Sequence, residues 1–241
     1  RPDRLIVAMT TYNFKSIFAW NIFLYSGFAA ILVVYLWFML DRTVSNYSKP
    51  VGVFAFLWRI ILTTGTGSIF GFLIARDAYG TAILAPLFII MSLLYGTVIY
   101  FLLLKVINYF QDTLMTDEVK DNLRKITIFF LFANLYFLAL YHITNLYISK
   151  HYDYEVFILT AGGIYTIIFW IGQVLIGLLL PLYFLLNKNS NNESNFMISS
   201  LLVVFGSFAA IYVIIISGQA FPLNIFNDYI KKNENFFADK N

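Results

Sequence analysis

The sequence predicts an all-α integral membrane protein, built as an antiparallel bundle of about six transmembrane helices. Of its 241 residues, 60% are hydrophobic and only 12% are charged, whereas about a quarter of the residues in a soluble domain are charged. The apolar residues form about six runs, each close to the ~20 residues that a helix needs to cross a bilayer. Because there are too few charges to coat a soluble surface, lipid or partner helices must cover this chain.

The expected spans follow one another along the chain as Ser16–Leu40, Val51–Ile74, Ala82–Leu104, Ile126–Ile148, Val156–Leu186 and Phe196–Ser217. Unpaired backbone groups are costly in hydrocarbon, and these runs are two to three times as long as a barrel strand, so they must be helices. The fifth run is long enough to tilt or to extend beyond the bilayer. A polar loop, Gln111–Lys125, separates the third run from the fourth. We treat residues 1–241 as one transmembrane domain.

Two prolines lie within these runs. Pro86 falls in the first turn of its helix, where the missing N–H costs little, while Pro181 is expected to kink or end the fifth helix. The chain opens with Arg1 and Pro2 without an initiator methionine, so we expect it to be part of a longer protein. Lysines and arginines are divided too evenly between the two sides to give an orientation.

The composition also excludes several classes of function. The chain has no cysteine, so it can form no disulfide, cysteine-ligated iron–sulfur cluster or thiolate zinc site by itself. A formal net charge of +3, with the basic residues placed between apolar runs, does not indicate nucleic-acid binding. The two histidines are His142 and His151, the latter expected in a loop, so a membrane haem with two facing histidines is rejected. No metal site is predicted.

Arg59 is the most informative single residue because it lies well inside the second run. A charge there costs a few kcal/mol, so the side chain is expected to face the bundle interior with a partner, or else to snorkel towards the nearer membrane surface. At about 100° per residue, Thr63 and Thr66 lie on the same side of the helix. Gly67 and Gly71 form a GxxxG pattern, which predicts close packing against a neighbouring helix.

The fourth run carries a second group of polar residues, in which Asn134, Tyr141 and Asn145 share a narrow arc and His142 lies at its margin. His142 could exchange protons near neutral pH, but a structural histidine bonded to a carbonyl group explains the residue equally well. No Asp or Glu lies in the middle of any run, which argues against a complete proton wire. Gln173, in the fifth run, is expected to bond to a neighbouring helix.

Several ordered blocks of the sequence resemble the polysulfide reductase NrfD family. They are RPDR at Arg1–Arg4, TTYNFKSIFAWNIFLYSGF at Thr10–Phe28, GTGSIFGFLIARDAYGTAILAPLFIIMS at Gly65–Ser92, YHITNLY at Tyr141–Tyr147, GGIYTIIFWIGQVLIGLLLPL at Gly162–Leu182 and GQAFPL at Gly218–Leu223. Together they cover nearly the whole chain. The closest subgroup is the DsrP-type membrane subunit of sulfur-metabolism complexes associated with sulfite reduction, and the membrane subunit of certain hydrogenases comes next.

This resemblance implies a subunit in the cytoplasmic membrane of a prokaryote that interacts with quinone, menaquinone being the expected one. Such a subunit has no haem or iron–sulfur cluster of its own and exchanges electrons with a ferredoxin-like iron–sulfur partner, with cytochrome subunits as further candidates. Family members have about eight to ten helices, and their first helices precede the Arg-Pro motif. The chain is therefore expected to lack those helices and part of the usual quinone pocket.

Three functional hypotheses follow. In the first, the subunit exchanges electrons between quinol and its iron–sulfur partner, with Asn21, Arg59 and Thr63 as head-group contacts and with Arg76 and Asp77 at the mouth of the site or as a structural ion pair. In the second, the same fold translocates protons through Asn134, Tyr141 and His142. The alternative is a secondary transporter or a purely structural membrane anchor, although no inverted repeat is evident.

Overall fold

The structure is a computed structural model that describes residues 16–110, 116–187 and 193–222, in which every regular element is helical. Six helical stretches within these ranges are long and apolar enough to cross a membrane. The predicted all-α membrane fold is therefore confirmed. The Arg1–Arg4 motif and the polar tail from Leu223 onward lie outside the described residues.

Four of the six spans described consist of one long α-helix, preceded by a short 3-10 helix in the second span, and the other two contain π-helical stretches. The long helices are α2 (Ile17–Leu40), α3 (Ser48–Gly71), α4 (Leu84–Phe110) and α5 (Asp117–Tyr147). The fifth span joins α7 (Ile164–Ile167), the π-helix η3 (Ile168–Leu179) and α8 (Leu180–Leu186), and the sixth joins α9 (Glu193–Tyr212), the π-helix η4 (Val213–Ser217) and α10 (Gly218–Ala220). Shorter elements are the 3-10 helix η1 (Ser45–Tyr47), α6 (Ser149–Val156) and the π-helix η2 (Phe157–Ala161).

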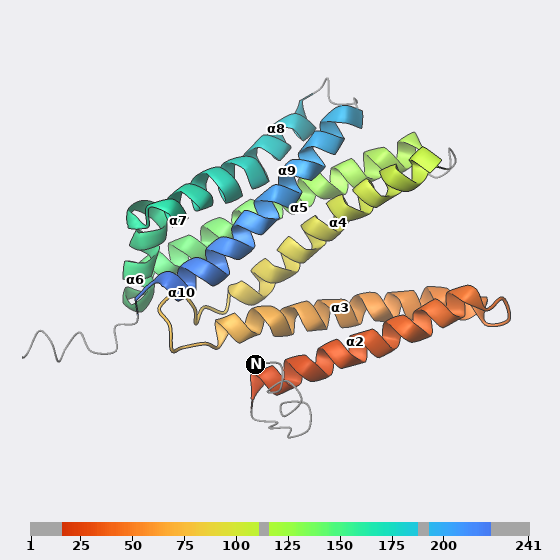
Figure 1. Ribbon diagram of the computed structural model, residues 1–241, viewed down its shortest axis with the longest axis horizontal. Coiled ribbons are helices and arrows are strands. Elements are labelled where there is room, and N and C mark those ends of the chain that lie inside the picture. The colour runs from red at the N-terminus through yellow and green to blue at the C-terminus, as the bar shows by residue number, and fades with distance from the viewer. Residues whose placement is uncertain (1–15, 111–115, 188–192, 223–241) are drawn as a thin grey trace, which may run out of the picture.

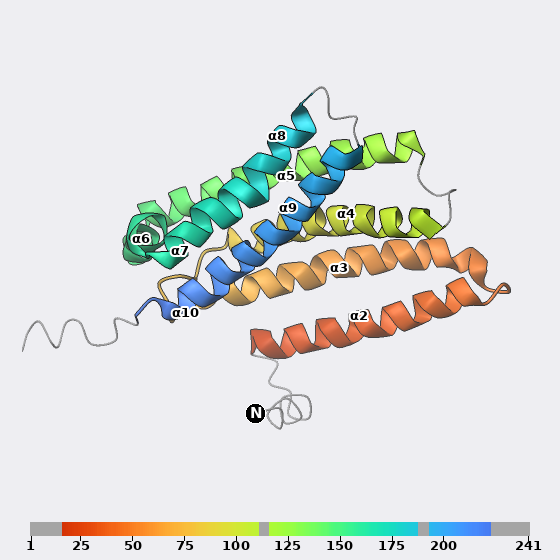
Figure 2. The same ribbon diagram turned by 45° about the horizontal axis from the view of Figure 1, so that its top comes forward.

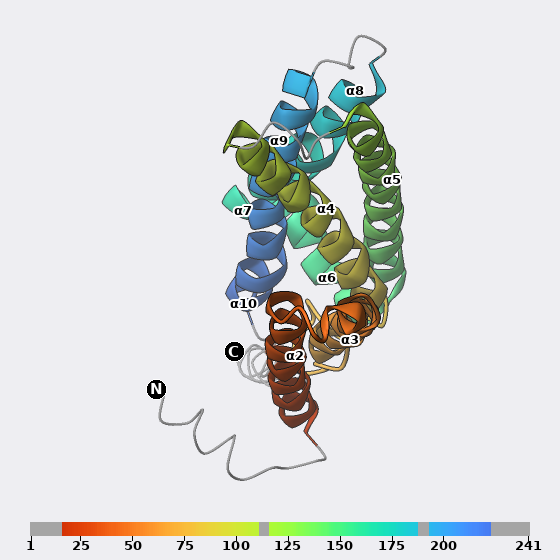
Figure 3. The same cartoon turned by 90° about the vertical axis from the view of Figure 1, so that its right-hand side faces the viewer.

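The helices form a hairpin beside a four-membered bundle (Figure 1). α2 and α3 lie side by side as the hairpin, whereas α4, α5, the α7–α8 span and α9 surround a common core (Figures 2 and 3). The short helices α6 and α10 lie at the same end of the bundle as the connection between α3 and α4 (Figure 1). We call this end the α6 end and the opposite one the α8 end.

Small residues allow α3 to approach α4 closely, as the GxxxG pattern predicts. A methyl group built on Gly67 would lie 2.7 Å from Ala85 Cα and 2.9 Å from the Leu84 carbonyl oxygen. A methyl group built on Gly71 would likewise lie 3.3 Å from the Thr81 carbonyl oxygen. Pro86 falls in the first turn of α4 as predicted, so the hairpin joins the bundle at the point where α4 begins.

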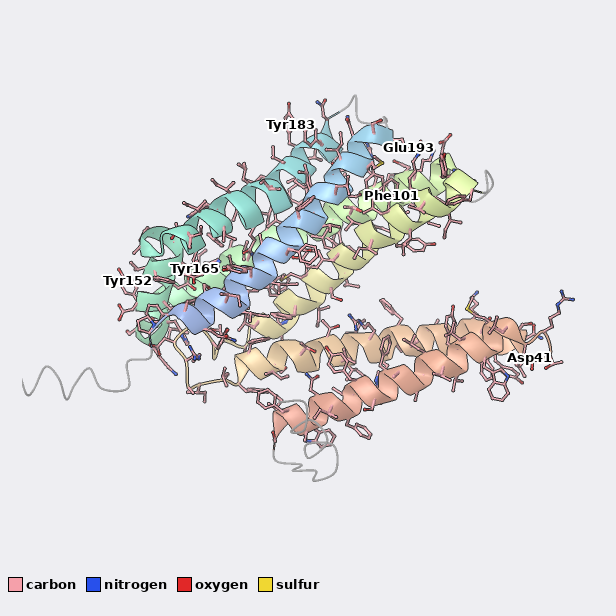
Figure 4. The ribbon with its side chains drawn as sticks, viewed as in Figure 1. Asp41, Phe101, Tyr152, Tyr165, Tyr183 and Glu193 are labelled. Atoms are coloured by element: carbon pink, nitrogen blue, oxygen red, sulfur yellow. The ribbon has the colours of Figure 1, made fainter. Side chains whose placement is uncertain are left out.

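The core lies between α4, α5, the fifth span and α9. Leucine is the commonest of its buried side chains. Phe101 of α4, labelled in Figure 4, stacks on Phe196 of α9 with ring centroids 3.8 Å apart. Glu193, the first residue of α9, pairs with Lys105 of α4 and Lys120 of α5 at the α8 end (Figure 4). An aromatic stack and a small ion-pair cluster therefore both join α4 to α9.

The predicted fifth span, Val156–Leu186, is wrong at its start. The spanning helix begins at Ile164, and the residues from Val156 to Ala161 continue the short α6. Gly163 separates the two with φ +57°, a conformation that glycine adopts without steric cost. Pro181 does not end the helix either, because α8 stays helical to Leu186.

The fourth helix begins earlier than hydropathy predicts, at Asp117 instead of Ile126. Its N-terminus is marked by Thr116, whose hydroxyl accepts a hydrogen bond from the Val119 N–H, and by two acidic residues in the first turn. Both features stabilise a helix start. The first turns of α5 are polar, so a search for apolar runs does not detect them.

Candidate functional site

A pocket of 660 Å³ opens between α3 and α4 and extends to α5 and α9. Its walls are mostly aromatic and aliphatic, with hydroxyl groups and one cation among them. The lining residues are Tyr25, Phe56, Arg59, Leu62, Thr63, Thr66, Phe88, Met91, Ser92, Leu93, Tyr95, Gly96, Thr97, Ile99, Tyr100, Leu123, Ile126 and Ile211. Ligand sites for small organic molecules typically enclose about 300–1,000 Å³ and combine apolar walls with a few polar groups. We call this site the α3–α4 pocket.

Arg59 is the cation of the α3–α4 pocket. Its side chain is exposed, whereas the sequence analysis expected it either to face the bundle interior with a partner or to snorkel towards the membrane surface. Its guanidinium carbon lies 5.6 Å from the centroid of the Phe28 ring, and no ion pair holds it within the described ranges. A guanidinium inside a membrane span is costly unless it has an acceptor, so this side chain is suited to bind an oxygen of a ligand in the pocket.

Thr63 and Thr66 line the same pocket as Arg59, as their helical spacing predicts. Their hydroxyls donate to the carbonyl oxygens of Arg59 and Leu62, at 2.8 and 3.0 Å. Tyr25 of α2 brings its hydroxyl to 3.4 Å from Thr66 Oγ1. α2 and α3 therefore supply hydroxyl groups and the one cation to the pocket, and α4 adds the hydroxyl-bearing residues Ser92, Tyr95, Thr97 and Tyr100 among its apolar side chains.

The other three predicted quinone ligands do not line the pocket. Asn21 is buried on α2, and its Oδ1 has no partner in the described part of the chain. Arg76 donates to the carbonyl oxygens of Gly218 and Gln219, at 3.2 and 3.1 Å, and Asp77 accepts at its carbonyl oxygen from the His151 Nδ1, 2.6 Å away. Arg76 and Asp77 form no ion pair with each other. Their hydrogen bonds instead attach the connection between α3 and α4 to α10 and α6.

A second polar site lies at the α6 end, around the fully buried Glu155. Its Oε2 is 2.7 Å from His142 Nδ1, and its Oε1 accepts from Asn145 Nδ2 at 2.8 Å. Asn145 Oδ1 in turn accepts from the Thr81 hydroxyl at 2.7 Å. We call Thr81, His142, Asn145 and Glu155 the Glu155 cluster. A carboxyl group bonded to an imidazole can store and release a proton.

The sequence analysis missed Glu155 because this residue precedes the fifth apolar run. α5 ends at Tyr147, and the extended backbone of Ile148 turns the chain so that α6 folds back onto the last turns of α5. A signal for burial was nevertheless present. His151, Tyr154, Glu155 and Ile158 recur at the spacing of one helix face, and all four are buried. His151 therefore lies in a helix and not in the predicted loop.

Buried tyrosines attach the connection between α3 and α4 to the rest of the α6 end. Tyr141 donates to the Ala78 carbonyl oxygen at 3.1 Å, and Tyr79 donates to that of Ile214 at 2.9 Å. Burial raises the pKa of Tyr79, although the nearby Arg76 charge opposes this effect. Because a raised pKa keeps the phenol protonated at neutral pH, Tyr79 remains a hydrogen-bond donor.

The predicted proton-path residues divide into two groups. Tyr141 and His142 lie at the α6 end, where His142 binds the Glu155 carboxyl instead of a backbone carbonyl group. Asn134 is buried farther along α5 and lines a small cavity near the middle of the bundle. Buried Leu138 lies between them on the same helix face. The structure therefore does not join Asn134 and Tyr141 by adjacent polar side chains.

The residues present fit a quinone better than a metal ion. Among the described residues, no group of three or more His, Cys, Asp or Glu side chains is placed to hold a metal. The α3–α4 pocket, in contrast, combines aromatic walls with Arg59 and hydroxyl groups. Such a surface can enclose a flat ring and bind its oxygen atoms.

Comparison with known proteins decides the family. The family described as "Polysulphide reductase, NrfD" matches residues 1–223. The chain belongs to the NrfD family. It is thus a multi-pass integral membrane protein, in agreement with the helices of the structure.

One curated relative of this NrfD-family chain comes from Archaeoglobus fulgidus. It is the "Hdr-like menaquinol oxidoreductase integral membrane subunit", which is 27% identical over 223 residues. The match covers 89% of this chain but 54% of the relative, so the chain spans about half the length of that protein. No solved structure matches the NrfD-family chain.

Proposed function

We propose that this chain is the quinone-interacting membrane subunit of a menaquinol oxidoreductase complex. It exchanges electrons between the quinone pool and a ferredoxin-like iron–sulfur subunit, in a complex of the DsrP type in the cytoplasmic membrane of a prokaryote. Cytochrome subunits are further candidate partners. The family membership and the name of the archaeal relative support the class of complex. The observation that carries the proposal is Arg59, which lies exposed in a largely apolar pocket within a membrane span.

In this proposal, the chain's own residues bind and orient the quinone. Arg59 donates hydrogen bonds to a ring oxygen, while the aromatic and aliphatic side chains of α4 contact the faces of the ring. Thr63 and Thr66 line the same pocket, where their oxygen lone pairs can accept hydrogen bonds from the hydroxyls of the quinol. The quinone itself supplies the redox chemistry, and the protein supplies position and electrostatics.

Replacing Arg59 by alanine tests this assignment. A hydrogen bond to a charged group is worth about 1.5–3 kcal/mol, so Arg59→Ala should weaken the apparent affinity for menaquinol analogues by about tenfold or more. Steady-state oxidation of these analogues by the purified complex measures the effect. The matched control is Lys49→Ala, because Lys49 is an exposed cation on the same helix that does not line the pocket. Oxidation by Arg59→Ala with wild-type kinetics would remove Arg59 from the quinone site.

Proton transfer through the later helices is the second candidate function, and buried Glu155 is the observation that favours it. The cluster supplies an acid that the apolar runs themselves lack, next to His142 and Tyr141. In this reading, Glu155 and His142 share and pass on a proton at the α6 end. A transporter or a structural anchor is supported by no comparable observation in the described residues.

Replacing His142 by glutamine tests the proton route. If His142 passes protons, His142→Gln should change the pH–rate profile of quinol oxidation, because the amide that replaces the imidazole cannot take up and release a proton. The control is Asp153→Asn, which removes an exposed carboxylate from α6. A profile identical to that of the wild type would exclude His142 from any rate-limiting proton transfer.

A further inference from the structure

A small enclosed cavity lies in the four-helix bundle, next to the α3–α4 pocket, with which it shares Tyr95. It is lined by Tyr95 of α4, Asn134 of α5, Gln173, Gly177 and Leu178 of the fifth span, and Gly206 of α9. Four membrane spans therefore meet around it. The backbones of Gly177 and Gly206 are in such close contact that a methyl group on either would collide with the other, which keeps the cavity small.

Gln173 makes the cavity more than a packing defect. The residue is only 4% exposed, and its Oε1 has no hydrogen-bond partner among the protein groups that the structure describes. Buried polar atoms in native proteins are nearly always satisfied by protein or by ordered water. The cavity that Gln173 lines also has the side chains of Asn134 and Tyr95 on its walls, so polar groups from three helices face the same space.

The size of the cavity restricts what can occupy it. Its volume of about 10 Å³ is close to the minimum that holds a single water molecule. A buried water molecule typically has two to four polar partners, and Tyr95, Asn134 and Gln173 meet that number. A bound cation would require more oxygen ligands and usually a carboxylate, whereas every polar side chain on these walls is neutral.

We propose that the cavity is a binding site for one structural water molecule. The water donates a hydrogen bond to Gln173 Oε1 and takes Asn134 and Tyr95 as its other polar partners. It thereby links α4, α5 and the fifth span in the middle of the membrane, where no bulk water can satisfy the amide. The site includes no residue of the Glu155 cluster and shares only Tyr95 with the α3–α4 pocket.

The test is an electron cryo-microscopy map of the intact complex in lipid nanodiscs, at a resolution that shows ordered water. We expect one density peak within about 3.2 Å of Gln173 Oε1, present in the wild type and absent in Gln173→Met, which has a similar volume but no amide. The matched control is Gln219→Met, because Gln219 is an exposed glutamine of α10, and this variant should retain the peak. The wild-type map decides the question even if Gln173→Met does not fold.

Thermal unfolding gives an independent result. If the water satisfies the amide, Gln173→Met removes a partner of the water and should lower the unfolding midpoint by about 2–4 °C. If the cavity is dry, the same substitution removes an unsatisfied acceptor and leaves the midpoint unchanged or raised. Four outcomes would each overturn the proposal. Three concern the map: an empty cavity, a direct contact between Gln173 Oε1 and Asn134 or Tyr95, or a peak with five or more oxygen neighbours. The fourth is an unchanged or raised unfolding midpoint.

Discussion

Gly206→Ala should prevent the protein from accumulating in its folded form. A methyl group on Gly206 would lie 2.0 Å from Gly177 Cα and 2.9 Å from Gly177 N, so it would meet backbone that cannot change rotamer. α9 and the π-helix η3 would have to separate along the contact that holds the fifth and sixth spans together. Overpacking a core typically costs about 1–3 kcal/mol, and a collision of two backbones should reach or exceed the upper end of that range.

Size-exclusion profiles and thermal unfolding of the detergent-purified variants measure this effect. Gly96→Ala is the matched control, because Gly96 also lies in a membrane helix but a methyl group there meets no atom within 4 Å. Alanine is also the better helix former, so this control should unfold at or slightly above the wild-type midpoint. A Gly206→Ala protein with wild-type elution and midpoint would contradict the close contact between the two helices.

Glu155→Ala should be the most destabilising substitution at the α6 end. The alanine would leave Nδ2 of the fully buried Asn145 and Nδ1 of the partly buried His142 without their acceptor. Removing one partner of a buried, hydrogen-bonded pair costs about 3–5 kcal/mol, because the remaining polar groups are buried without compensation. The same change would loosen Thr81, which reaches the carboxyl through Asn145.

The free energy of unfolding in detergent measures this loss. Glu155→Gln should be less destabilising than Glu155→Ala, because an amide oxygen can still accept from Asn145. Asp153→Ala is the control on the same short helix, since Asp153 is exposed, and it should change stability little. Equal stability of Glu155→Ala and Asp153→Ala would mean that the cluster does not hold α6 in place.

Hydropathy was sufficient to predict the spans, because about 20 apolar residues in succession have few alternatives to a membrane helix. It failed where a boundary depends on local backbone conformation. The fifth span starts after Gly163 because a positive φ breaks the helix there, and a count of apolar residues carries no such information. α5 starts at Asp117, since capping by Thr116 and not hydrophobicity fixes its first turn.

The candidate site was predictable only along single helices. Helical spacing places Thr63 and Thr66 on the same side as Arg59, and all three line one pocket. Spacing along one helix says nothing about how helices are arranged, so the nomination of Asn21, Arg76 and Asp77 grouped residues that the structure places elsewhere. The burial of Glu155 depends on the turn at Ile148, which folds α6 against α5. The apolar runs of the sequence do not reveal this tertiary contact.

The connection between α3 and α4 differs from an ordinary surface loop. Hydrogen bonds hold it at several points. Two come from side chains of α6, in which Lys150 Nζ donates to the Ile74 carbonyl oxygen at 2.6 Å and His151 Nδ1 donates to that of Asp77. Others join it to Tyr141 of α5 and to the backbone of η4. Its backbone is thus immobilised when the chain folds. A protein that associates with this end of the bundle would therefore meet a preformed surface. Binding to such a surface costs less conformational entropy than binding to a mobile loop, which must be ordered first.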